Sequence, residues 1–268
     1  MTYMKIVSAI LSMSVLSVAA VAARESVSQE PSTLWSGPAD STIPEASLAN
    51  AKDHDIDLLK TNFKPGLHIV PLSQSWFTGE LAITMKRQIA EQTTKGFHVA
   101  SGDQVPDISR AVSASKHLRQ GEKFVGKRYA SLAEIRPRLF ADPIGIDRTP
   151  LASARFIEAG TAGGVENGLW TGIARYFDAP GIGLVMLEEL DYGVTKASVT
   201  MVEEWINADV NGHPAIAKTA RTTDGRVLVS VGWMTDHMSY SLLLEPVNPD
   251  DIEVNQQALL DIARNLGS

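Results

Sequence analysis

The chain of 268 residues contains no cysteine. This absence excludes a disulfide-stabilised scaffold, a zinc site with thiolate ligands, an iron–sulfur cluster and a cysteine nucleophile. The sequence also lacks G-x-S-x-G, H-E-x-x-H and the complete G-x-x-x-x-G-K-[ST], which are typical of serine hydrolases, zinc proteases and phosphate-binding loops. We therefore expect neither a metal nor a cofactor.

Basic residues are fewer than acidic residues, 24 against 31, which gives a formal net charge of -7. An acidic balance argues against a dedicated nucleic-acid-binding protein. The 44% of hydrophobic residues and 21% of charged residues are ordinary for a globular protein, and we find no repeat of fixed period.

Long apolar runs occur only at the N-terminus. Lys5 precedes an uncharged stretch, Ile6 to Ala23, which ends in small residues at Val21-Ala22-Ala23. This pattern predicts a secretory signal peptide over residues 1–23, cleaved near Ala22 or Ala23. The alternative is a retained membrane anchor, since the stretch is just long enough to span a bilayer. With the signal removed, we expect a secreted or periplasmic protein without a transmembrane segment.

A polar tail or linker follows at residues 24–66, because Ser and Pro are frequent there and large apolar side chains are few. Residues 67–160 form a mainly helical segment in our prediction. Leu81, Met85 and Ile89 recur at helical spacing, and Ile108 and Val112 do the same.

Two more short helices are predicted in this segment. One begins at Ser131 with a capping box to Glu134, and the other runs from Thr149-Pro150 to Gly160. Residues 161–168 hold three Gly and no large aromatic residue, so we place a loop and a domain boundary there. A phosphate-binding role for this Gly-rich run is the less favoured alternative, since it has no Lys.

Period-two patterns dominate residues 161–268. Ile182 to Leu190 is an apolar strand candidate, and Val227 to Trp233 and Met238 to Leu244 alternate. Asn211-Gly212 and Asp224-Gly225 predict tight turns. A stripe at Leu259, Ile262, Ala263 and Leu266 predicts a helix that covers one sheet face. The fold class is therefore α+β, with an N-terminal helical segment followed by an antiparallel meander of about five strands under a C-terminal helix.

The last 60 or so residues resemble a small α+β module of bacterial anti-sigma-factor-like and cell-envelope proteins. The resemblance rests on these segments: Asn211-Gly212-His213-Pro214-Ala215, Trp233, Tyr240-Ser241-Leu242 and Leu259-Leu260-Asp261-Ile262-Ala263. The module is also similar to the half-open sheets of periplasmic lipoprotein carriers. It implies a non-catalytic role and supplies no catalytic residues.

Basic residues concentrate between positions 110 and 138, where eight of them face two acidic residues. The candidates for binding an anionic surface or an acidic partner are Arg110, Lys116, Arg119, Lys123, Lys127 and Arg128. The favoured interpretation is intramolecular, because residues 139–268 carry 18 acidic and 8 basic side chains and the basic helices can lie against them or remain solvated.

The sharpest catalytic match is Ser113-Ala114-Ser115-Lys116, the S-x-x-K pattern of penicillin-recognising serine enzymes. On a helix, Lys116 lies one turn from Ser113 and can act as its base. Lys218-Thr219-Ala220 follows where that family has K-T-G, but Ala220 replaces the Gly, and the S-D-N element is missing.

Acidic clusters give two weaker candidates. Asp53-His54-Asp55-Ile56-Asp57 offers metal ligands in an incomplete set, and a helix start is the favoured interpretation. Glu188-Glu189 and Glu203-Glu204 suggest paired carboxylates, although neighbours on a strand point to opposite faces. We favour charge on exposed strand edges. The tryptophans, Trp205 and Trp233 among them, are expected in the core or around a ligand cavity.

These observations predict a non-catalytic binding protein whose ligand is an envelope component, a protein partner or a small apolar molecule, held between sheet and helices. The alternative is an envelope serine hydrolase that uses Ser113 and Lys116.

Overall fold

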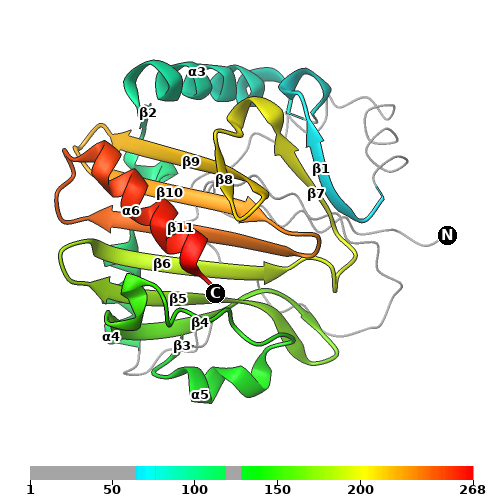
Figure 1. The fold of residues 1–268 in the computed structure, drawn as a ribbon, viewed down its shortest axis with the longest axis vertical. Coiled ribbons are helices and arrows are strands. Elements are labelled where there is room, and N and C mark those ends of the chain that lie inside the picture. The colour runs from blue at the N-terminus through cyan, green and yellow to red at the C-terminus, as the bar shows by residue number, and fades with distance from the viewer. Residues whose placement is uncertain (1–63, 76, 119–127, 268) are drawn as a thin grey trace.

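The computed structural model describes residues 64–75, 77–118 and 128–267, with the backbone alone for 114–118 (Figure 1). The predicted signal peptide, most of the predicted tail and the Asp53-to-Asp57 cluster lie outside these residues. In the described part, no helix combines the length and the apolar character that a membrane span requires.

Eleven strands are present in the described residues. Their bounds are β1 Gly66–Val70, β2 His98–Ala100, β3 Arg128–Tyr129, β4 Arg155–Glu166, β5 Leu169–Ala179, β6 Gly183–Asp191, β7 Ser198–Val202, β8 Ala208–Val210, β9 His213–Thr222, β10 Val227–Met234 and β11 Met238–Pro246.

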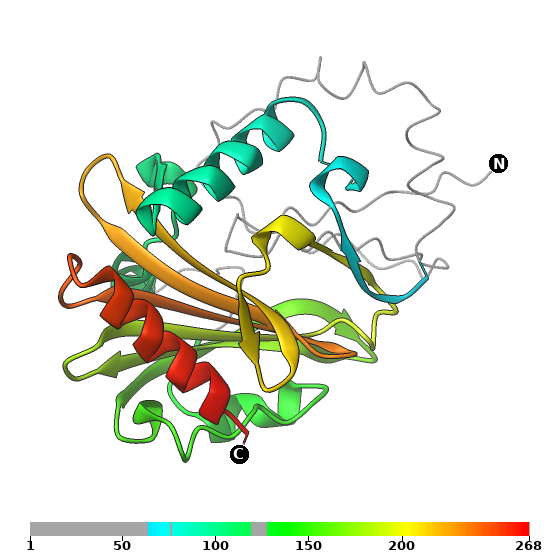
Figure 2. The same cartoon turned by 45° about the horizontal axis from the view of Figure 1, so that its top comes forward.

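Nine of the strands form one large sheet in the order β2-β9-β10-β11-β6-β5-β4-β3, with β8 also paired to β9. All of its pairings are antiparallel except β2 with β9. Two antiparallel runs, β4-β5-β6 and β9-β10-β11, join where β6 pairs with β11. The remaining strands, β1 and β7, form a small parallel sheet beside the β9 end of the large one (Figure 2).

Helices occupy both sides of the large sheet. The α-helices are α3 Gly79–Lys95, α4 Ile108–Leu118, α5 Leu132–Ile135 and α6 Ile252–Asn265. The 3-10 turns are η1 Leu72–Gln74, η2 Gly102–Gln104, η3 Arg136–Arg138, η4 Pro150–Ala152 and η5 Glu203–Trp205.

The C-terminal helix α6 crosses the front of the central strands in Figure 1. Leu259 and Ile262 of α6 are fully buried against Val229, Val231 and other aliphatic side chains of the sheet. At about 2 kcal/mol for each buried aliphatic side chain, this interface is a main source of stability. We call the covered side the α6 face.

The opposite face of the sheet is covered as well. Strand β10 is buried at every position, so both of its faces are shielded from bulk water. The α4 helix packs over one end of this face, and α3, β1, β7 and η5 pack near the other. Sequence patterns predicted the α6 cover and left open whether the basic helices lie against the sheet; the structure places α4, which belongs to that basic segment, over one end of the opposite face.

Side-chain amides complete the hydrogen bonding of β9 between its short neighbours β8 and β2. Asn207 accepts from Ala217 N and donates to Ala217 O, both at 2.8 Å. Gln92 of α3 accepts from Thr219 N at 3.0 Å. These bonds fix the middle of β9, where Lys218 lies.

The predicted α+β class is confirmed, and most elements are where the patterns placed them. Helix α3 has Thr78 as its N-cap and Gly96 as its left-handed C-cap, and Leu81, Met85 and Ile89 pack into one cluster. Asn211 and Gly212 have positive φ in the turn between β8 and β9.

Other parts of the secondary-structure prediction are wrong. The large sheet has nine strands rather than about five, and β2 and β3 lie in the segment predicted to be mainly helical. Ser131 precedes α5 but donates to the Glu134 carboxylate, so the predicted capping box does not form.

The predicted helix from Thr149 to Gly160 is the short turn η4 followed by the start of β4. The predicted loop 161–168 is the rest of β4 and a turn at Asn167 and Gly168, so the expected boundary falls inside a strand.

Candidate functional site

The candidate site lies on four neighbouring strands, β9, β10, β11 and β6. Successive side chains of a strand point to opposite faces of its sheet. On the α6 face, Val229, Leu242 and Leu187 are aliphatic and fully buried. On the opposite face, the corresponding positions change from apolar to polar and back along each strand.

Five residues form what we call the polar strip: Lys218 on β9, Ser230 and Gly232 on β10, Ser241 on β11 and Glu188 on β6. The register links them directly. Lys218 is opposite Ser230, Gly232 is opposite Ser241, and Ser241 is opposite Glu188. At about 4.8 Å between strands, the strip crosses about 14 Å from β9 to β6.

Apolar clusters flank the polar strip on both sides. The α4 cluster joins that helix to the sheet and contains Ala100, Val105, Ile108, Val112, Ala174, Tyr176, Ala220, Leu228 and Leu243. The Trp205 cluster contains Leu72, Phe77, Met85, Tyr192, Ala197, Val199, Met201, Val202, Trp205, Ile216 and Met234. Glu245 fixes α4 in place by accepting from Ile108 N at 2.6 Å and Ser109 N at 3.0 Å.

Lys218 forms the basic end of the polar strip. Its Nζ lies 4.2 Å from the centre of the Trp205 ring, which is a cation–π contact. No carboxylate of the described residues lies within ion-pair distance of it. Burial lowers the pKa of the Lys218 ammonium to about 8, because protein atoms rather than water surround most of the group.

His98 of β2 extends the basic end. Its ring centroid lies 6.3 Å from that of Trp205 in a T-shaped arrangement, and its Nδ1 is buried without a hydrogen-bond partner in the described part. Burial, followed by the charge of Lys218, lowers the pKa of His98 to about 4. The imidazole is therefore neutral at pH 7 and able to accept or donate a hydrogen bond.

Glu188 forms the acidic end. Ala174 and Ser241 are its cross-strand neighbours, both of them small. Burial raises the pKa of the Glu188 carboxyl to about 7, and the described residues supply no hydrogen bond or ion pair to it. The Ser241 hydroxyl beside it is also buried and without a hydrogen-bond partner there. Buried polar groups normally have partners, so the Ser241 hydroxyl has hydrogen-bonding capacity that the described residues do not use.

The next residue, Glu189, points to the α6 face and has a different role. Its carboxylate pairs with Arg175 at 2.7 Å, and both side chains are almost wholly buried. Glu189 also accepts from Ile144 N at 2.7 Å, while Arg175 donates to Ile144 O at 2.8 Å. This pair holds the loop around Ile144 against the sheet.

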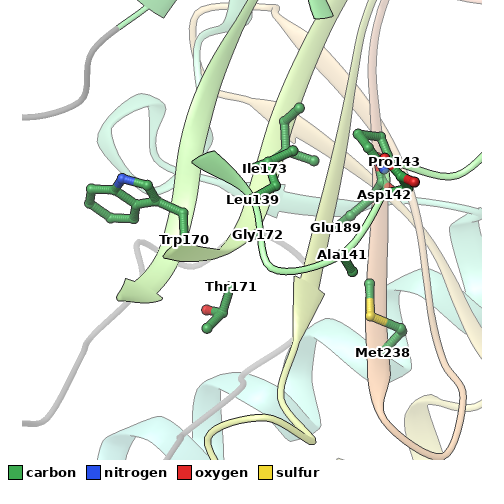
Figure 3. Close-up of a pocket in the computed structure, with 10 residues that line it drawn as sticks. All are labelled: Leu139, Ala141, Asp142, Pro143, Trp170, Thr171, Gly172, Ile173, Glu189 and Met238. Atoms are coloured by element: carbon green, nitrogen blue, oxygen red, sulfur yellow. The ribbon is translucent and has the colours of Figure 1, made fainter. Parts of the chain in front are cut away.

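A hollow beside this loop is too small for a ligand. It is lined by Leu139, Ala141, Asp142, Pro143, Trp170, Thr171, Gly172, Ile173, Glu189 and Met238 (Figure 3). Its volume of about 10 Å³ is about that needed for one water molecule. We therefore assign the candidate site to the polar strip.

The acidic and basic groups of the polar strip are separated from each other. The acid and the base are three strands apart, too far for both to act on one reacting atom. In the described part of the chain, no three His, Asp or Glu side chains gather in a way that would hold a metal ion.

The residues of the predicted alternative sites lie on α4 and β3 or outside the described part. Ser113 is exposed on α4, and only the backbone of Lys116 is described. Arg110 is exposed on the same helix. Arg119, Lys123 and Lys127 lie outside the described residues.

Arg128 is half-buried, 3.5 Å from a carboxylate oxygen of Glu158 and stacked on the Tyr176 ring at 4.7 Å. The basic segment and the acidic C-terminal part are therefore paired at this point, while the anionic-surface interpretation stays a prediction.

The predicted pair of carboxylates, Glu188 and Glu189, includes one residue of the polar strip, Glu188. Glu188 and Glu189 do point to opposite faces, but their expected position on an exposed edge is wrong, because β6 is central. Glu203 and Glu204 are exposed in η5, where Glu204 accepts from Leu72 N at 2.8 Å. The sequence indicated Lys218 only through the segment Lys218-Thr219-Ala220, which is similar to K-T-G.

The sequence of β10 contains a feature from which the polar strip could have been predicted. Ser230 and Gly232 interrupt a strand that is otherwise wholly apolar.

Comparison of the chain with protein-family models, with curated proteins and with solved structures gave no match, so the resemblance to the envelope module stays a prediction.

Proposed function

We propose that this chain is an exported, non-catalytic binding protein that holds a small apolar or amphipathic molecule along the polar strip. One observation carries the proposal: Lys218, Ser241 and Glu188 lie on one sheet face, between two apolar clusters, without partners for their polar groups in the described part. Apolar walls with a few convergent polar groups are typical of small-molecule sites.

A small molecule fits this face better than a protein partner does. Ser230 and Ser241 are at most 5% exposed, so the middle of the strip lies below the surface. A stable protein interface needs about 800 Å² of accessible surface on each side. Among the ligand classes predicted from the sequence, we therefore favour the small apolar ligand.

Titration with N-phenyl-1-naphthylamine, a neutral apolar dye, tests this function. We expect saturable fluorescence enhancement at a stoichiometry near one, with the emission of Trp205 quenched through energy transfer. Ser241→Met should weaken dye binding at least tenfold by filling the strip. Ser153→Leu, on an exposed turn, should leave it unchanged.

Gly232→Ala is a milder obstruction, for the case that Ser241→Met does not fold. Dye binding that survives in a folded strip variant would overturn the proposal, and so would a wild-type protein that binds no dye. Labelling of Ser113 by a covalent β-lactam would instead support the serine-hydrolase alternative.

Export is the second part of the proposal and is supported by Lys5 and the uncharged stretch Ile6 to Ala23. When the full chain is expressed in bacteria, we expect the product outside the cytoplasm, with an intact mass that corresponds to cleavage near Ala22 or Ala23. A full-length product in the cytosol would contradict export.

A further inference from the structure

We infer that the ligand carries a carboxylate head group, which pairs with Lys218 where this side chain rests on Trp205. This inference deepens the proposed function and rests on it. It concerns the basic end of the polar strip and the kind of molecule that this end selects.

The argument begins with the charge of Lys218. An ammonium that is largely removed from water normally has an anion beside it. In the described residues, the contact made by Nζ is instead the face of Trp205 at 4.2 Å, which compensates only part of the lost hydration. A carboxylate from a ligand would supply the missing partner.

The surroundings of Lys218 favour one negative charge rather than two. His98 is held neutral by burial and by Lys218, so it adds no second positive charge, and its unpartnered Nδ1 can bond a ligand oxygen. No arginine fork of the kind that grips phosphate shares the strip. A single ammonium with one neutral hydrogen-bonding group suits a monoanionic carboxylate.

The rest of the strip accounts for the ligand's body. Glu188 is three strands from Lys218, so it cannot act as the partner of the ammonium. Between them, Ser230, Gly232 and Ser241 present small side chains over which a chain can lie. Leu184 and Met186 of β6 pack against the α4 cluster and are only partly buried, so they can contact an aliphatic tail. The ligand class is therefore an aliphatic carboxylic acid.

The test compares dodecanoate with dodecanol and dodecyltrimethylammonium by displacement of the naphthylamine dye at pH 7. We expect wild-type protein to bind dodecanoate at least tenfold more tightly than dodecanol, and the cationic analogue most weakly. Lys218→Met should remove the preference for dodecanoate while dodecanol still binds. The control Lys86→Met, an exposed lysine on α3, should keep the preference.

Lys218→Met should also raise the thermal midpoint of the ligand-free protein, because a poorly solvated charge is removed. A purely structural lysine would show the opposite shift. Equal affinity of the wild type for acid and alcohol, or a preference that persists in Lys218→Met, would overturn this inference and leave the proposed function standing. If none of the three amphiphiles nor the dye binds, the proposed function itself fails. The three-ligand comparison on wild-type protein remains decisive if the variant does not fold.

Discussion

Glu188 should make the folded protein less stable as the pH rises. Its pKa rises from an ordinary value of 4.5 to about 7 on folding, so the folded state binds the proton more tightly than the unfolded state does. Stability is therefore lost between pH 4.5 and pH 7, and the full cost is present above pH 7. At about 1.4 kcal/mol for each pH unit, the shift corresponds to about 3 kcal/mol, of which we expect about 2 to 3 because the side chain is partly exposed.

Glu188→Gln removes this titration, and urea denaturation between pH 5 and pH 8 measures the result. The variant should match the wild type near pH 5 and exceed its free energy of unfolding by about 2 to 3 kcal/mol at pH 8. The difference between the two proteins is the informative quantity. His98 acts in the opposite direction in the wild type, because its pKa falls from 6.5 to about 4 and stability is lost as the pH falls through that range.

Glu203→Gln, which changes an exposed carboxylate, serves as the control and should show no such pH-dependent difference. A difference between wild type and Glu188→Gln that stays constant from pH 5 to pH 8 would refute the reasoning, because it would mean that burial does not shift this carboxyl group.

Three further predictions concern the framework. Glu189→Leu should lower the free energy of unfolding by about 3 to 5 kcal/mol by leaving Arg175 charged and buried, and the double variant with Arg175→Met should recover most of it in urea titrations. Leu259→Ala should cost about 2 to 5 kcal/mol and lower the urea midpoint at constant slope, since the side chain is fully buried. Gly172→Ala should lower the thermal midpoint, because a Cβ there would clash with the backbone carbonyl oxygen of Glu189; Gly164→Ala, in open space, should not.

Local periodicity was sufficient to predict the elements that have one apolar face. The stripes of α3 and α6 became the packed faces of those helices. Strand β4 was missed because its alternation is broken: the pairing with β5 shifts register between Phe156 and Glu158 and again between Ala162 and Val165. With small residues between these shifts, neither a helical period nor a period of two survives.

The site was harder to predict than the fold. Which of the two adjacent glutamates faces the polar strip depends on what covers each side of the sheet, and the cover opposite α6 comes from η5, α4 and other distant segments. Lys218 has the same difficulty, because its partner Trp205 lies outside the strand pattern. Sequence patterns therefore pointed to Glu188 and Lys218 but could not predict which side chains surround them.

The Arg175–Glu189 pair also selects one alignment of β6 over its alternatives. Leu184 to Leu187 are all apolar, so a register shift of this strand by one residue would still place apolar side chains on both faces of the sheet. A slip that brings Leu190 to the position of Glu189, however, would leave the buried Arg175 without its anion and move Glu189 to the face of the polar strip. An insertion or deletion that shifts β6 in this direction should therefore be tolerated far less well than substitutions among its aliphatic positions, so a charge pair on one side of the sheet fixes which residues line the polar strip on the other.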